Sequence, residues 1–130
     1  MIKHDQVKKL LTLAAVGEAV TGLALLVYPP IVVRLLFGAE IAGAGIVMSR
    51  IAGISLIALG VSCWPGHDAD SSIPRALRTM LSYSLLATLY LGYLGINGEW
   101  VGKLLWPAVV IHAGVTILFA RAWLTERQNR

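Results

Sequence analysis

The sequence predicts an all-α integral membrane protein that forms a four-helix bundle from a single domain, residues 1–130. The composition favours this class, because 57% of the residues are hydrophobic and only 14% are charged, against about 25% charged residues in an average soluble domain. The apolar residues also gather in four runs, and about 20 apolar residues are enough to cross the roughly 30 Å hydrocarbon core of a bilayer. The short polar segments between the runs then serve as loops.

The first spanning helix is expected over about residues 9–28. After a short basic start, the run Leu10 to Tyr28 is apolar and its only charged residue is Glu18. The run is longer than the roughly 7 to 15 apolar residues of a signal peptide and has no small-residue cleavage site, so we expect it to be retained. The double proline at 29–30 ends the helix, because proline lacks the N–H group and clashes with the preceding turn.

The second spanning helix is expected over about residues 43–64, and it contains one permanent cation, Arg50. Arg50 lies about seven residues, or on the order of 10 Å, from the start of this helix. An arginine at that depth normally faces the bundle interior or a wet cavity, where it finds a partner. Ser49, Gly53 and Gly60 supply small side chains near one face, which lets helix backbones approach closely. We therefore expect the arginine face to be a packing face as well.

The remaining segments complete the four-helix pattern. Residues 31–42 are apolar but too short to span, so they are expected to form either a short helix at the membrane surface or a loop packed over the end of the bundle, with Gly38 ending the segment. Residues 65–74 form the clearest loop, because Pro, Gly, Asp and Ser are dense there. The third and fourth spanning helices are expected over about residues 75–95 and 104–123.

Basic residues are distributed unequally between the two sides of the predicted bundle. One side holds only Arg34 and Lys103, and Arg50 belongs to neither side because it lies within a span. The positive-inside rule therefore predicts that both termini lie in the cytoplasm, and we expect a bacterial inner-membrane location. The basic residues on the terminal side are Lys3, Lys8, Lys9, Arg75, Arg78, Arg121, Arg127 and Arg130.

Three ionisable residues fall at similar depths in the predicted bundle. Counting about 1.5 Å per residue from the helix starts places Glu18, Arg50 and His112 near the midplane, each on a different helix. A bilayer makes such groups costly unless they are paired or used. We expect a buried polar cluster, which is either a ligand or proton site or a structural network in which Glu18 and Arg50 neutralise each other. The residues expected to line it are Ser49, Ser84, Thr88, Tyr90 and Thr116.

The sequence predicts no cofactor and no metal site. Cys63 is the single cysteine, so it has no partner for an intramolecular disulfide or a cysteine metal cluster. His112 is the one histidine in a predicted span, since His4 and His67 fall in a tail and a loop, so a bis-histidine haem would need a dimer. The spans also lack a set of metal ligands. Neither a Gly-rich phosphate loop, nor a nucleophile elbow, nor a pair of catalytic carboxylates is visible.

The order of the motifs resembles two groups of small membrane proteins. The first-helix glutamate, YPP, LLFGAE, SRIAGISLIALGVSCWPG and LLWPAVVIHAGVTILFARAW are together similar to small four-helix bacterial inner-membrane proteins of the DoxX-like type, and this resemblance implies no agreed activity. A more limited resemblance is to the small multidrug resistance transporters. It rests on the number of helices and on Glu18 in LAAVGEAVTG, which matches the proton-exchanging glutamate of that family. The third helix here lacks that family's Gly- and Trp-containing signature.

These patterns favour a non-enzymatic membrane protein, either an accessory or interaction subunit or a binder of a small or lipid-like ligand. One alternative is a proton-coupled small-molecule transporter that acts as an oligomer. Another is an enzyme that acts on a lipid or quinone in a pocket lined by Tyr83, Tyr90 and Tyr93. The expected partners are the lipid bilayer, further copies of the chain or a larger membrane complex, and a small or lipid-like ligand. Nucleic acid is not expected, because the basic residues lie between apolar runs.

Overall fold

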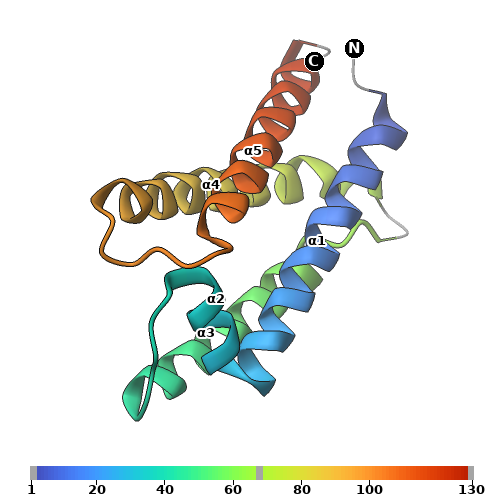
Figure 1. Cartoon of the computed structure of the whole chain (residues 1–130). Coiled ribbons are helices and arrows are strands. Elements are labelled where there is room, and N and C mark those ends of the chain that lie inside the picture. The colour runs from blue at the N-terminus through green and yellow to red at the C-terminus, as the bar shows by residue number, and fades with distance from the viewer. Residues whose placement is uncertain (1–2, 67–68, 129–130) are drawn as a thin grey trace.

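The computed structural model describes residues 3–66 and 69–128, and within them the chain forms five α-helices and no strand (Figure 1). The helices are α1 (His4–Val27), α2 (Pro29–Phe37), α3 (Ala44–Ser62), α4 (Ala69–Asn97) and α5 (Leu105–Gln128). In the described part of the chain, α1, α3, α5 and residues Ser72–Asn97 of α4 are long and apolar enough to cross a membrane. This confirms the all-α class and indicates a multi-pass membrane protein.

The double proline separates α1 from α2. α1 ends at Val27, and Pro29 and Pro30 occupy the first positions of α2, where a missing N–H group is not needed. α2 is the short segment that the sequence predicted, although it begins at Pro29 and not at Ile31. It ends at Gly38, as predicted, because the φ of 67° at this C-cap is a left-handed conformation that glycine adopts without steric cost.

The turn between α3 and α4 is shorter than predicted. α4 begins at Ala69, so Pro74 lies inside the helix and not in the loop before it. A proline near a helix start removes one backbone hydrogen bond. The burial of Ile73 and Leu77 on this turn offsets that loss, because both side chains are almost fully removed from solvent. His67, which the sequence placed in the loop, lies outside the described residues.

The four long helices are arranged as two helical hairpins. α1 packs along α3 and α4 packs along α5, whereas α3 makes little contact with α4 or α5 in the described residues. Both termini lie at one end of the molecule, and α2 and the α4–α5 loop lie at the other (Figure 1). The spanning helices are therefore not evenly packed as one bundle, and the two hairpins meet chiefly at their ends.

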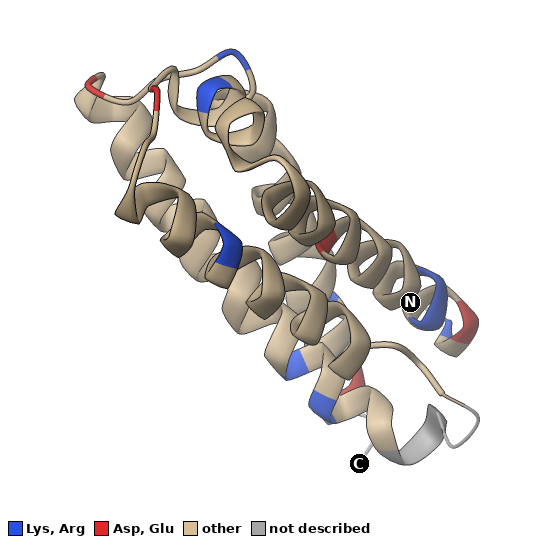
Figure 2. Cartoon of the chain, turned by 90° about the horizontal axis from the view of Figure 1, so that it is seen from below, with Lys and Arg blue, Asp and Glu red and all other residues tan. Residues whose placement is uncertain are grey.

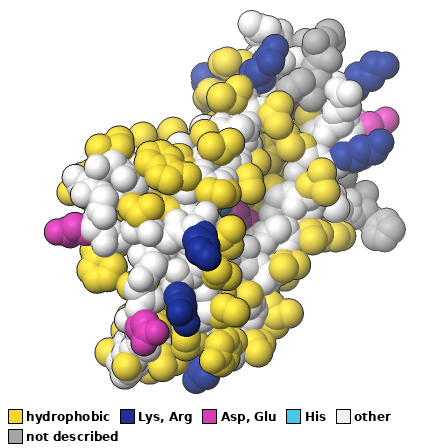
Figure 3. All heavy atoms as spheres, in the orientation of Figure 1, with side chains coloured by type: hydrophobic (Ala, Val, Ile, Leu, Met, Phe, Trp, Pro, Cys, Tyr) yellow, Lys and Arg dark blue, Asp and Glu magenta, His cyan; other side chains and the backbone are white. Residues whose placement is uncertain are grey.

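Charged residues and apolar side chains are also sorted along the molecule. Figure 2 shows most of the charged segments near the two ends, with few between them. Large apolar side chains cover much of the surface, and Figure 3 shows this on one face. Such a surface would be unfavourable in water and suits contact with lipid.

At the end that carries the termini, the two hairpins share a hydrophobic core. α1 begins at His4 and α5 ends at Gln128, so both helices extend further into the polar tails than the sequence predicted. The extension of α1 is stabilised by the burial of Val7. The extension of α5 includes Arg127, whose guanidinium lies 4.4 Å from the centroid of the Trp123 ring. The buried members of this core are Val7, Leu11, Ala15, Cys63, Ile73, Ala76, Leu77, Met80, Phe119 and Ala122.

At the opposite end, the loop of residues 98–104 docks on the end of α2. The N–H groups of Gly102 and Leu104 donate to the carbonyls of Leu36 (3.0 Å) and Leu35 (2.8 Å). These bonds satisfy carbonyls that have no partner within the last turn of α2. Glycine is needed at position 102, because a Cβ there would collide with the Leu35 carbonyl.

Within the first hairpin, small residues allow α1 and α3 to approach closely. A Cβ at Gly22 would lie 2.5 Å from the carbonyl oxygen of Gly53, and one at Gly60 would lie 2.6 Å from that of Ala15. The predicted packing role of Gly53 and Gly60 is thus confirmed. Arg50 lies seven residues before Ile57, which contacts Gly22, so it is on nearly the same side of α3. Its side chain is exposed, however, so the expected burial of Arg50 with a partner is not seen.

Candidate functional site

Glu18 of α1 and His112 of α5 meet between the two hairpins. Glu18 Oε1 lies 3.7 Å from His112 Nε2, and the side chains remain 14% and 21% exposed, respectively. The structure therefore brings together two of the three ionisable residues that the sequence grouped. Their partial exposure matters, because a ligand or a proton carrier can reach them.

Tyr83 of α4 completes the site. Its hydroxyl lies near the Glu18 carboxyl and interacts with it. Its ring lies edge-to-face with the imidazole of His112, with centroids 5.9 Å apart and an angle of 60° between the planes. The sequence pointed to Tyr83 only as lining for a lipid or quinone pocket. Tyr83 is next to Ser84 in the sequence, and Ser84 was expected to line the cluster, so this neighbour could have indicated that Tyr83 belongs to the site.

The hydrogen bonding of His112 indicates where its protons lie. Nδ1 lies 2.9 Å from the carbonyl oxygen of Ala108, which can only accept, so we assign a proton to Nδ1. In a neutral ring, Nε2 is then an acceptor that faces another acceptor, the Glu18 carboxylate. A second proton relieves this mismatch, and it can reside on Nε2 or on the carboxyl. Either group can thus take up one further proton, and the 3.7 Å separation of Nε2 and Oε1 is longer than a hydrogen bond.

The register of the first hairpin keeps Arg50 away from this site. Gly53 meets Gly22 and Gly60 meets Ala15, so the part of α3 level with Glu18 lies near residue 57. Arg50 is therefore about 10 Å nearer the α2 end. No ion pair or hydrogen bond of Arg50 occurs within residues 3–66 and 69–128. The predicted pair of Glu18 and Arg50 is not formed.

The expected lining residues differ in what they contact. Ser84 is buried, with 2% of its surface exposed. Thr88 and Thr116 are half-buried and bond to their own helices, since Thr88 Oγ1 donates to the Ser84 carbonyl and Thr116 Oγ1 to the His112 carbonyl, each at 2.7 Å. Thr116 therefore anchors the turn that carries His112, whereas its hydroxyl does not donate to the imidazole.

The other two expected lining residues do not approach Glu18. Tyr90 is 63% exposed on α4. Ser49 is half-buried on α3, next to Arg50 and at the same distance from the level of Glu18. In the described part of the chain, no group of three or more His, Cys, Asp or Glu residues is placed to hold a metal ion.

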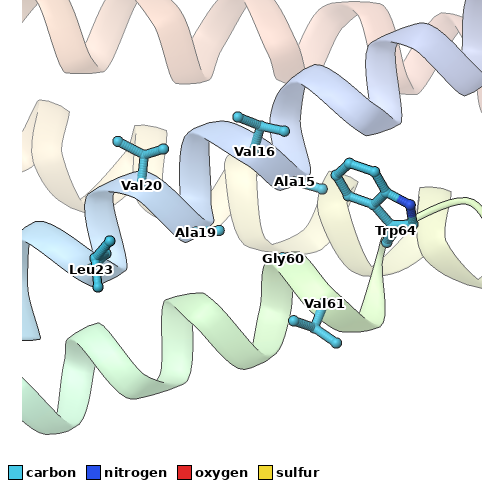
Figure 4. A pocket seen from close by; sticks show the side chains of 8 residues that line it. All are labelled: Ala15, Val16, Ala19, Val20, Leu23, Gly60, Val61 and Trp64. Carbon is cyan, nitrogen blue, oxygen red and sulfur yellow. The ribbon is translucent and has the colours of Figure 1, made fainter.

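A separate apolar groove of about 540 Å³ runs along the first hairpin. Figure 4 shows its side chains, which are Ala15, Val16, Ala19, Val20, Leu23, Gly60, Val61 and Trp64. Residues 16, 20 and 23 lie more than about 100° around α1 from Glu18. The groove therefore belongs to the lipid-facing surface and adds no polar group to the site.

Fold and site together define a class, a multi-pass helical membrane protein with a Glu–His–Tyr site between two hairpins. No protein-family model matches the chain, and comparisons with curated proteins and with solved structures give no match. The resemblances to DoxX-like proteins and to small multidrug resistance transporters therefore rest on the sequence motifs alone.

Proposed function

We propose that the protein is a non-enzymatic membrane protein that binds a small or lipid-like ligand at Glu18, His112 and Tyr83. The observation that carries this proposal is the approach of Glu18 Oε1 to His112 Nε2 at 3.7 Å, with both side chains partly exposed between the hairpins. Ionisable groups within apolar spans are costly and usually functional. A carboxyl, an imidazole and a phenol offer donors and acceptors to a polar head, and the apolar helix surfaces suit a hydrophobic body.

The finer placement belongs to the same proposal. We propose a bacterial inner-membrane protein with both termini in the cytoplasm. The excess of Lys and Arg on the terminal side supports this orientation, because cytoplasmic loops and tails carry that excess. The position of both termini at one end is what an even number of spans requires (Figure 1).

A second candidate function is proton-coupled transport of a small molecule by an oligomer. Two observations favour it. Nδ1 of His112 is bonded to the Ala108 carbonyl, which leaves Nε2, on the side of Glu18, free to take up a proton. Arg50 does not pair with Glu18, so the carboxylate is available to exchange a proton for a cationic substrate.

Exposed Arg50 favours the interaction role as well. A guanidinium that faces lipid within a span is costly unless it reaches the interface or another chain covers it. We propose that the α3 surface around Arg50 contacts a second copy or another subunit. Sedimentation in a mild detergent should show a smaller particle for Arg50→Leu than for the wild type. An unchanged particle would remove this support.

Infrared difference spectroscopy across a pH titration in lipid tests the site. Loss of a carboxyl band in Glu18→Gln identifies the signal of Glu18. We expect Arg50→Gln to leave the titration of this band unchanged and His112→Gln to alter it, because of these two residues only His112 lies beside the carboxyl. Addition of a quinone, a fatty acid or a lipophilic amine should perturb the band if the site binds that class. Equal effects of the two variants would contradict the assignment.

Flux measurements separate binding from transport. Proteoliposomes loaded with ethidium and placed under a pH gradient should release it through the wild type and not through Glu18→Gln if the protein exchanges protons for cations. If wild-type vesicles keep ethidium while the infrared band still responds to a lipophilic amine, the protein binds cations without transporting them.

A further inference from the structure

A second pocket lies at the end of the molecule away from the termini. It forms where α2 meets the loop of residues 98–104, and it encloses about 580 Å³. Its walls include both basic residues of this end, Arg34 and Lys103. Figure 2 shows two basic segments next to each other there. Two cations that were far apart in the sequence are thus collected in one pocket.

Neither cation has an anionic partner in the part of the chain that the structure describes. No ion pair or hydrogen bond joins Arg34 or Lys103 to a carboxylate in residues 3–66 or 69–128. The acidic residues of this end, Glu40 and Glu99, are not among the residues that line the pocket. Two like charges in one pocket repel each other, and an anion between them would turn this repulsion into attraction.

The end of α2 does not need these cations. Arg34 lies in its last turn, where a cation often serves free carbonyls. Those carbonyls already accept backbone N–H groups, since Gly38 donates to Arg34 (2.9 Å) and the docked loop donates to Leu35 and Leu36. The guanidinium is therefore available to a ligand.

The pocket is also partly apolar, and it lies at the end of the spanning helices. Ile31, Leu35 and Val101 contribute to its walls and are between 37% and 50% exposed. α2 connects two membrane-spanning helices, so its ends lie near the level of lipid headgroups. An anion with hydrocarbon attached matches this combination better than a free ion.

We propose that the pocket binds the phosphate of an anionic phospholipid headgroup. Arg34 and Lys103 hold the phosphate, and Ile31, Leu35 and Val101 contact the glycerol and the first acyl carbons. The inference rests on the membrane placement proposed above and not on the ligand of Glu18. Glu18→Gln should leave lipid binding here unchanged, so failure of either proposal can be recognised separately.

Native mass spectrometry of the protein in a neutral detergent tests the proposal. Phosphatidylglycerol and phosphatidylcholine with the same acyl chains are added at equal concentration. The wild type should retain phosphatidylglycerol in preference. Arg34→Gln with Lys103→Gln should lower that preference on the order of 25-fold, because each pocket cation in contact with the phosphate is expected to favour the anionic lipid by a factor of about five.

Matched variants complete the test. Arg75→Gln with Arg78→Gln removes the same charge from exposed positions on α4 and should keep the preference, as should the exchange of Arg34→Lys with Lys103→Arg. If the double glutamine variant does not fold, the two single variants are tested instead, and each should lower the preference for phosphatidylglycerol by a factor of about five. The proposal is overturned if the wild type shows no preference or if the α4 pair loses it equally. Displacement of phosphatidylglycerol by excess inorganic phosphate would also overturn it, since the site would then take a free anion.

Discussion

Glu18 is held by side chains from the opposite hairpin, with His112 on α5 and Tyr83 on α4. One residue of α1 therefore links three helices at mid-depth, where apolar packing between the hairpins is sparse. Polar contacts away from competing water are stronger than their exposed equivalents. At the residue scale, this contact positions the carboxyl for a ligand or a proton.

Removing the phenol hydroxyl tests the role of Tyr83. Tyr83→Phe should lower the free energy of unfolding in detergent by about 1 kcal/mol, because the Glu18 carboxyl loses one donor. Tyr93→Phe is the matched control, since Tyr93 lies on the same helix and is 61% exposed. Similar effects of the two substitutions would argue against a hydrogen bond at Glu18.

The first hairpin depends on where its glycines lie. Gly22 of α1 and Gly53 of α3 face each other so closely that each would place a Cβ 2.5 Å from the other's carbonyl oxygen. Gly17, on the same helix as Gly22, has no atom of another element within 4 Å of an added Cβ. At the scale of the element, two glycines of one helix thus have opposite roles.

Alanine substitutions at the two glycines should change the stability of the protein in opposite directions. Gly22→Ala should destabilise the protein by about 1–3 kcal/mol, because the added methyl group forces the backbones apart. Gly17→Ala should stabilise it by up to about 1 kcal/mol, since alanine has the higher helix propensity and meets no neighbour. Thermal unfolding of both variants in one detergent is the measurement. Destabilisation by Gly17→Ala would mean that this face is packed in the membrane, for example against a second copy.

Considered as a whole molecule, the protein is two hairpins joined at both ends. A hydrophobic core joins them near the termini, and the docking of Gly102 and Leu104 on α2 joins them at the other end. The Glu–His–Tyr site lies between these two junctions. Such an arrangement fixes the two ends and places the polar site between them.

Thiol labelling tests the proposed orientation. Cys63 is first replaced by alanine, and single cysteines are introduced as Glu99→Cys in the α4–α5 loop and Arg127→Cys near the end of α5, both at exposed positions. A membrane-impermeant maleimide should label intact spheroplasts only at position 99, and inverted vesicles only at position 127. Labelling of both positions from one side would contradict the prediction that the two ends of α5 lie on opposite sides of the membrane. Partial labelling from both sides would indicate dual insertion.

Local sequence patterns were enough to predict the helical class, the approximate spans, the helix stop at Gly38 and the packing role of Gly53 and Gly60. These features are local, because hydropathy, the missing N–H of proline and the size of a side chain act within a few residues. Pro74 shows the limit of local patterns, since burial of its neighbours keeps it within α4.

The pairing of Glu18 with His112 depends on how the two hairpins pack against each other. Counting depth from helix starts placed Arg50 and His112 equally near, but depth depends on the register between helices. The glycine contacts set that register for α3 and move Arg50 about 10 Å away, while the second hairpin brings His112 and Tyr83 to the carboxyl. Docking of the loop of residues 98–104 on α2 likewise brings Arg34 and Lys103 into one pocket. Contacts between distant segments depend on how whole helices pack, and no short stretch of sequence encodes that packing.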